Sequence, residues 1–182
     1  MKKLFLFVVL FGFIMMGSSA YAVWKWENPQ NIKVYIPQDD DKTQLMTKAF
    51  EEWQKKSQNV VAFQFVKTEE EADIDVTFIE KNLEQICGNI DALGCAKYGA
   101  FNGKRHSKIY IAKRRPKGLL LSNTQVYAIM RHEIGHSLGL EHVKNPNNIM
   151  FATTNLGIAI KQNIQIDDIK NLYDLYGVKY KK

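Results

Sequence analysis

The sequence predicts an α/β fold of the α+β type: a mixed, twisted sheet of about five strands with two helices, followed by a loop and a C-terminal helix. Short runs of alternating apolar residues recur between residues 32 and 112. Two longer segments instead repeat apolar residues at helical spacing. The order of strand, helix, three or four strands, helix, loop and helix indicates a layered domain. The 182 residues suffice for one domain with its own core.

The first strand and helix are expected near the start of this domain. Residues 32–36 alternate in polarity and end at Pro37, which is typical of a strand. Residues 39–41 are aspartates that can cap a following helix. Apolar residues then recur at helical spacing, and the expected buried face comprises Leu45, Met46, Ala49, Phe50 and Trp53.

Further strands are expected across the middle of the chain. Residues 60–66 alternate, with Val61, Phe63 and Phe65 on one face and Ala62, Gln64 and Val66 on the other. Residues 72–79 form the next strand, with Ile74, Val76 and Phe78 apolar and with Asp73 and Asp75 expected to face outward. Residues 95–101 and 108–112 are two shorter strands around the turn-like Asn102-Gly103.

Two helices complete the predicted fold. A long helix begins near Ser122, with Ser122 or Asn123 as its N-cap. A last helix is expected over residues 167–176, capped by Asp167 and stopped by Gly177. Its inward-facing residues should be Ile169, Leu172 and Tyr173.

The long helix carries a metal-ligand pattern, HEIGHSLGLEH, over residues 132–142. Residues four apart share a helix face, so His132 and His136 can direct their imidazoles at one metal ion. Glu133 lies about 100° around the axis from His132, where it can take a proton from a metal-bound water. The opposite arc can pack on the sheet through Val126, Met130, Ile134 and Leu138.

Gly139 explains how a third ligand can reach the metal. Glycine adopts the positive φ with which helices commonly end, so the chain can turn back and present His142. Three histidines leave one zinc position open for water, which is typical of a catalytic site. A structural role without metal is disfavoured, because it would bury three histidines and a glutamate at a helix end.

The full string resembles the zinc signature of the metzincin peptidases, and within them that of the matrixins. Met150, in Asn147-Asn148-Ile149-Met150, is similar to the methionine of their Met-turn, although an ordinary core methionine is the alternative. Residues 72–78 are similar to the matrixins' third strand, and residues 165–177 are similar to their last helix.

This resemblance implies a metzincin-like fold and a set of residue roles. His132, His136 and His142 would bind one catalytic zinc ion, and Glu133 would activate the water. The strand near residues 95–101 would form the upper rim of the cleft and pair with an extended peptide. Residues 150–160 would wall the pocket for the side chain that follows the cleaved bond.

Several family features are missing from the sequence. The first strand starts about ten residues after the expected signal peptide, too few for a prodomain, and the two cysteines lack the context of the family's latency switch. A second, structural zinc ion is not supported, because His106 is the only further histidine. Calcium-binding loops are not recognisable. Ala152 stands where astacin-like and serralysin-like enzymes have a tyrosine.

Residues 1–22 read as a signal peptide. Lys2 and Lys3 precede an apolar run over residues 4–16, and Ala20-Tyr21-Ala22 offers a cleavage site, with a second one at Ala20. An uncleaved membrane anchor is the alternative, but the run is short against the roughly 20 residues that span a bilayer. We therefore expect residues 23–182 to be a single metallopeptidase catalytic domain, secreted or periplasmic, without a stable membrane anchor.

Cysteine content and charge suggest further properties. In an oxidising compartment, Cys87 and Cys95 suggest one disulfide that closes a small loop, and two free thiols are the alternative. The net charge is +6, and residues 113–117 form the main basic run. This run could bind an anionic partner, but the interpretation as a solvated loop is favoured because no aromatic residues are interleaved. Nucleic acid is thus not the expected partner.

These observations favour a secreted zinc endopeptidase that hydrolyses peptide bonds with a Glu-activated, zinc-bound water. The expected partners are peptide or protein substrates, and we expect a monomer. Two alternatives remain: a zinc-containing binding protein that has lost turnover, and a zinc hydrolase acting on a non-protein amide such as cell-wall material.

Overall fold

The computed structural model describes residues 24–180 except 102, 154–155 and 160. The expected signal peptide, residues 1–22, lies outside the described residues. The elements in chain order are β1 (Ile32–Tyr35), α1 (Thr43–Lys56), β2 (Phe63–Val66), η1 (Glu69–Glu71), β3 (Ile74–Ile79), α2 (Glu84–Cys87), β4 (Gly94–Phe101), β5 (Lys104–Ala112), α3 (Asn123–Ser137), α4 (Leu156–Ala159) and α5 (Ile166–Tyr176).

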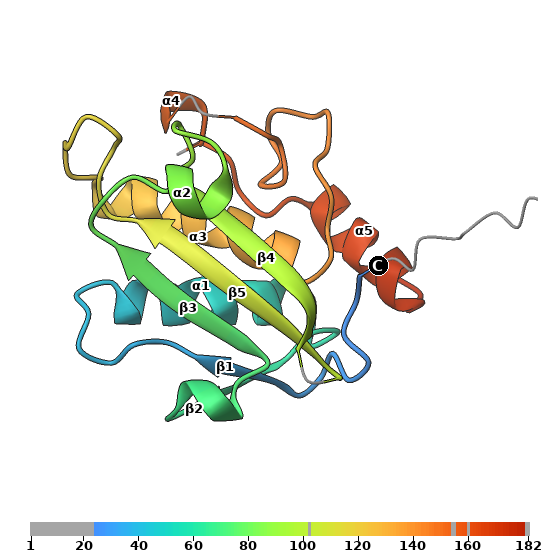
Figure 1. Ribbon diagram of the computed structural model, residues 1–182. Helices are drawn as coiled ribbons and strands as arrows, with labels where there is room; N and C mark the ends of the chain where they lie inside the picture. Colours follow the sequence, from blue (N-terminus) through green and yellow to red (C-terminus); the bar gives the residue numbers. More distant parts are fainter. Residues whose placement is uncertain (1–23, 102, 154–155, 160, 181–182) are drawn as a thin grey trace, which may run out of the picture.

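The described strands form one mixed sheet in the order β2-β1-β3-β5-β4, with α1 and α3 lying side by side against one face (Figure 1). β4 alone runs antiparallel to its neighbour β5, and it forms an edge of the sheet. The predicted fold class, a sheet of about five strands with two helices followed by a C-terminal helix, is confirmed. The short helices α2 and α4 were not predicted.

The core lies between the sheet and the two helices. Its largest side chains are fully buried, and they include Ile32 and Ile74 from the sheet, Phe50 and Trp53 from α1, and Met130 and Ile134 from α3. Full burial of such a side chain stabilises the fold by about 1.5–3 kcal/mol. This core holds α3, the helix with the histidine pattern, against the sheet.

Both ends of α3 follow from local sequence. Ser122 is the N-cap: its hydroxyl accepts a hydrogen bond from the Gln125 backbone N–H, and the Gln125 side chain accepts one from the Ser122 N–H. At the other end Gly139 has a φ of 96°. A Cβ on Gly139 would also lie 2.2 Å from the Trp24 carbonyl oxygen. Glycine is therefore required there both by backbone conformation and by close packing.

Three sequence predictions about helix caps and exposure are wrong. Asp167 does not cap α5; Gln165 is the N-cap, because Asp168 reaches back and accepts a hydrogen bond from its N–H. Lys42, not an aspartate, is the N-cap of α1, although the Asp40 carboxylate accepts a hydrogen bond from the Lys42 N–H. Asp75 does not face solvent, since it is 1% exposed and its carboxylate lies 2.5 Å from His106 Nε2.

A disulfide joins Cys87, the last residue of α2, to Cys95 on β4. α2 lies beside the start of β4 at one end of the sheet (Figure 1). The cross-link therefore ties the segment before β4 to the edge strand itself. Of the predicted turn between β4 and β5, Asn102 lies outside the described residues, while Gly103 has a φ of 75°.

Candidate active site

The imidazoles of His132, His136 and His142 converge on one point. Their Nε2 atoms lie 3.1 Å (His132 to His136), 3.0 Å (His136 to His142) and 3.3 Å (His132 to His142) apart. His132 and His136 project from α3, one turn apart. His142 is brought back to them by the turn at Gly139 and by the bond from the Val143 N–H to the Met150 carbonyl.

This triangle fits a tetrahedral zinc ion. Zinc binds imidazole nitrogen at about 2.0–2.1 Å, so two ligands at the tetrahedral angle lie roughly 3.3 Å apart. Among the described residues, these three histidines are the only group of three or more metal-ligating side chains whose ligand atoms converge. Three histidine ligands leave a fourth zinc position open, as in catalytic sites.

Backbone carbonyls orient two of the three rings. His132 Nδ1 lies 2.6 Å from the Ile149 carbonyl oxygen, and His136 Nδ1 lies 2.8 Å from the Leu140 carbonyl oxygen. A carbonyl only accepts, so each Nδ1 carries the proton and each Nε2 presents a lone pair. Burial lowers the pKa of His132 to about 4 and also lowers that of His136. Both rings are therefore neutral at pH 7, as a metal ligand must be.

Glu133 lies beside the histidines under the edge strand. It is 7% exposed, and burial raises the pKa of its carboxyl to about 8, although a hydrogen bond with the Ala96 backbone opposes this rise. Because the carboxyl lines the same cleft as the three histidines, it can exchange a proton with a molecule held there. A bound divalent cation would favour the carboxylate form.

Gly94, the first residue of β4, makes room for Glu133. A Cβ at Gly94 would lie 2.7 Å from Glu133 Cγ and 2.7 Å from Ile129 Cγ2, both closer than real contacts allow. We expect Gly94→Ala to displace the Glu133 carboxyl and to lower the kcat/KM of peptide hydrolysis by roughly 10²-fold, since a displacement near 1 Å can cost that much. Zinc content should not change. Steady-state kinetics measure kcat/KM, and metal analysis measures the zinc content.

Gly99 provides the matched control for this substitution. It lies on the same strand, and a Cβ there would meet no heavy atom within 4 Å. Gly99→Ala should therefore stay within about twofold of the wild-type rate. Equal rates for the two variants would show that Glu133 does not depend on the space at Gly94.

Met150 lies beneath the histidine helix. It is 1% exposed, and a Cβ added to Gly135 would lie 2.2 Å from its sulfur, so the thioether packs directly on the α3 backbone. The turn before it is held by buried Asp168, which accepts hydrogen bonds from Asn148 Nδ2 and the Ile149 N–H, both at 3.2 Å. Burial raises the pKa of Asp168. The turn thus positions the Ile149 carbonyl that orients His132.

These groups open into a cleft of about 910 Å³. It is lined by residues 93–96 and Tyr98 of the edge-strand region and also by residues 151–153, Ile158, Ala159 and Gln162, which we call the far wall. The three histidines and Glu133 lie on its floor, together with Ala128 and Ile129. The stretch over residues 150–160 that the resemblance assigned to a pocket wall therefore borders the cleft, although residues 154–155 and 160 lie outside the described residues.

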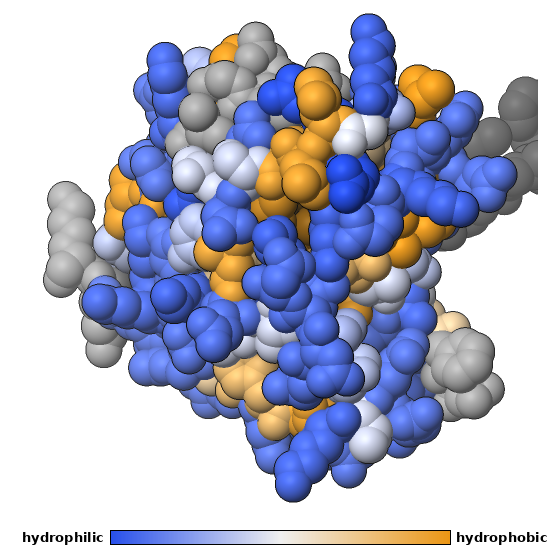
Figure 2. All heavy atoms as spheres, turned by 90° about the vertical axis from the view of Figure 1, so that its left-hand side faces the viewer, coloured by the Kyte–Doolittle hydropathy of each residue, from blue (hydrophilic) through white to orange (hydrophobic). Residues whose placement is uncertain are grey.

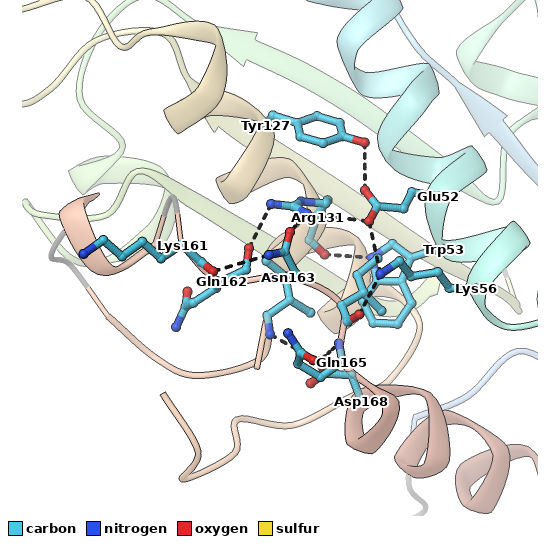
Figure 3. Close-up of polar contacts among 12 residues, drawn as sticks. Glu52, Trp53, Lys56, Tyr127, Arg131, Lys161, Gln162, Asn163, Gln165 and Asp168 are labelled. Atoms are coloured by element: carbon cyan, nitrogen blue, oxygen red, sulfur yellow. Dashed lines mark hydrogen bonds and ion pairs between the residues drawn. The ribbon is translucent and has the colours of Figure 1, made fainter. Parts of the chain in front are cut away.

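Several residues near this cleft were not anticipated from the sequence. The buried Arg131, next to His132, binds residues 162 and 163 (Figure 3). Gln162 itself lines the cleft. The sequence did offer a signal for Arg131, because it is a charged residue between apolar positions of a helix. Such a residue is buried only when it has partners. Asp168 carried no comparable signal, since one of two adjacent aspartates at a helix start looks like ordinary capping.

The remaining sequence candidates lie away from the cleft. His106 pairs with Asp75, on the paired strands β5 and β3. In the basic run, Lys113 binds Asp40, Asp41 and Glu80, and Arg114 binds Glu80. Two of its four cations are therefore paired within the protein, and the rest of the turn, residues 115–120, is exposed.

Figure 2 views the molecule from the side on which this turn projects. The face is largely hydrophilic, with hydrophobic areas between the hydrophilic ones. The turn contributes apolar surface, because Leu119 and Leu120 are 66% and 65% exposed. No helix of the described residues is long and apolar enough to cross a membrane.

A family model and several curated proteins match this chain. The matrixin model of the Peptidase_M10 family matches residues 23–177. A probable matrix metalloproteinase (095L) of Invertebrate iridescent virus 3 is 29% identical over 143 residues, which cover 75% of this chain and 38% of that protein. Macrophage metalloelastase of Rattus norvegicus is 38% identical over 58 residues, which cover 32% and 12%. The chain thus aligns with well under half the length of these relatives.

Solved structures show the fold. Archaemetzincin from Methanopyrus kandleri superimposes with a TM-score of 0.52 at 13% identity, covering 80% of this chain and 96% of that one. At this identity the likeness concerns the fold alone. The mixed sheet and its helices are therefore arranged as in that metzincin.

Proposed function

This chain belongs to the matrixin family, a branch of the metzincin zinc peptidases, and on that premise we propose that it is a secreted, zinc-dependent endopeptidase. The observation that carries the proposal is the convergence of three histidine Nε2 atoms within 3.0–3.3 Å, next to a buried glutamate in an open cleft. Residues 23–182 would form its single catalytic domain, as a monomer with one catalytic zinc ion.

The three histidines and Glu133 would have different roles in the reaction. His132, His136 and His142 would hold the zinc ion, which when bound lowers the pKa of a coordinated water and polarises the carbonyl of the substrate. Glu133 would take a proton from the attacking water and deliver it to the departing amine, acting first as general base and then as general acid. Burial of its carboxyl, which favours the protonated form, suits the second role.

The edge strand supports a peptide as substrate. β4 pairs with β5 along one side, and it borders the cleft along the other through Gly94, Cys95, Ala96 and Tyr98. An extended peptide can add to such an edge by main-chain hydrogen bonds, with its side chains alternating into and out of the cleft. The disulfide to Cys87 restrains the start of this strand.

The proposal is tested by metal analysis together with cleavage of a quenched-peptide library, with and without a chelator. We expect one zinc ion per chain and peptide cleavage that stops with the chelator and returns on adding zinc. Zinc without cleavage of any peptide would instead favour the binding-protein or non-peptide-amide alternatives. A chain purified without zinc that also fails to take it up would contradict the proposal. N-terminal sequencing of the exported protein tests removal of residues 1–22.

A further inference from the structure

A buried positive charge lies on the helix that carries the histidines. Arg131 directly precedes His132 and is 5% exposed. Its side chain points toward Gln162 and Asn163, in the segment that ends the far wall of the cleft (Figure 3). Removing a guanidinium from water is unfavourable unless several partners compensate. The partners therefore indicate what this residue holds in place.

The Arg131 guanidinium forms hydrogen bonds with two consecutive residues of that segment. Arg131 Nη2 donates to the Gln162 carbonyl oxygen at 3.0 Å, and Nη1 donates to Asn163 Oδ1 at 3.0 Å. The two bonds leave different nitrogens of one planar group, so they fix the direction as well as the position of the segment. The Nε atom has no hydrogen-bond partner among the described residues.

Neighbouring groups of α1 and α3 hold the guanidinium itself. Its Cζ lies 4.8 Å from the centre of the Tyr127 ring, and its Nη1 lies 3.6 Å from Glu52 Oε1. Tyr127 in turn donates its hydroxyl to Glu52 Oε2 at 2.8 Å. Lys56 lies 3.7 Å from Glu52 and donates to the Ile164 carbonyl oxygen at 2.9 Å. Three consecutive residues, 162–164, are thus bonded to charged groups on the two core helices.

Gln162 links this anchor to the cleft. It is 2% exposed, yet it lines the cleft, and its side-chain amide donates to the carbonyl oxygens of Pro146 and Phe151, at 3.3 and 3.4 Å. Phe151 and Gln162 are the two ends of the far wall. The bonds from Gln162 therefore join both ends of the wall to each other, and Arg131 joins the pair to α3.

We infer that Arg131 is a positioning residue for substrate specificity, which fixes the far wall of the cleft relative to the zinc-ligand helix. This inference rests on the proposed peptidase function. The wall determines which substrate side chains fit, while the three histidines and Glu133 depend on other contacts. Without the guanidinium, the position of the far wall relative to α3 should be less fixed, while the zinc ion should stay bound. A pocket that can no longer hold its shape discriminates less between side chains, which in a well-formed pocket differ by about 10–200-fold per methylene group.

The test uses the complete exported protein and the variant Arg131→Met, which retains much of the length of the side chain but not its donors. Kinetic constants are measured on peptides that differ only in the residue after the cleaved bond. We expect kcat/KM for the preferred peptide to fall about tenfold, mainly through KM, while peptides with glycine or alanine there change less than about twofold. Zinc content should remain at the wild-type level. Equal losses for all peptides, or an unchanged preference, would overturn the inference.

Two further variants complete this test, one as a control and one as a milder change at the same contact. Tyr127→Phe removes a hydroxyl from the same cluster but leaves both bonds to residues 162 and 163, so its peptide preference should match the wild type. Asn163→Ala removes one acceptor at an exposed position and should fold even if Arg131→Met does not. Like Arg131→Met, it should reduce the discrimination between the peptides, but by a smaller factor. Wild-type discrimination between the peptides in Asn163→Ala, together with reduced discrimination in Tyr127→Phe, would contradict the assignment.

Hydrogen exchange separates this inference from the proposed function. Backbone amides of residues 161–165 should exchange faster in Arg131→Met than in the wild type, and at the wild-type rate in Tyr127→Phe. This measurement needs no substrate. If the wild-type protein cleaves no peptide, the proposed function fails, and the exchange rates still decide whether Arg131 holds the wall. Unchanged exchange in Arg131→Met would refute the anchor itself.

Discussion

Glu133→Ala is expected to abolish peptide hydrolysis while leaving zinc bound. The substitution removes the group proposed to accept the proton of the attacking water but none of the three histidines, whose Nε2 atoms lie 3.0–3.3 Å apart. General acid–base catalysis contributes about 10²–10⁴-fold, so kcat should fall by at least about 10²-fold. Single-turnover rates measure the loss of hydrolysis, and metal analysis of the same preparation measures the bound zinc.

Glu141 provides a matched control, since it lines the same cleft but is exposed. Glu141→Ala should retain activity within a few-fold. The proposed general base would be refuted by a Glu133→Ala protein that hydrolyses peptides at the wild-type rate. If zinc were lost as well, the carboxyl would have to be assigned a part in holding the metal.

His136→Ala should remove both zinc and activity. His136 Nε2 lies 3.1 Å from that of His132 and 3.0 Å from that of His142. Loss of a direct ligand should weaken zinc binding by more than the roughly 10–100-fold that outer partners of a ligand contribute. Zinc at 100 times its Kd stabilises a folded protein by about 2.7 kcal/mol. For a domain of this size that equals a rise in Tm of about 5–10 °C.

Thermal unfolding with and without zinc therefore provides a readout that does not depend on catalysis. Zinc should raise the Tm of the wild type and leave that of His136→Ala unchanged. His106 is the matched control, because it is the one histidine outside the cleft and it pairs with Asp75. His106→Ala should keep the zinc-dependent rise. A rise of equal size in His136→Ala would place the zinc ion elsewhere.

The elements that were predicted well are those whose signals are local. The apolar spacing of α3 places Val126, Met130, Ile134 and Leu138 on one arc, and all four are fully buried in the structure. Ser122 followed by Gln125 specifies the start of the same helix, and Gly139 its end. These signals act within one or two helical turns, so they can be read without knowing what the helix packs against.

The failed predictions concern residues whose surroundings come from distant parts of the chain. Asp75 looked like an outward strand position, but His106 and Lys108 on the neighbouring strand bind its carboxylate in the folded protein. The cap of α5 was misassigned by two residues, because Asp168 satisfies the N–H groups of both Gln165 and the distant Ile149. No pattern within a short window distinguishes such an aspartate from its neighbour.

The sequence by itself determined the fold class and the metal-binding pattern, since the ligand spacing of four residues on a helix and the glycine before His142 are local geometry. Only the tertiary structure decided what surrounds them. It placed Gly94 of the edge strand over Glu133, the Ile149 carbonyl against His132, and Arg131 against the far wall of the cleft. Each of these contacts joins residues 17 or more positions apart, and their pairing depends on how the sheet, helices and loops pack together.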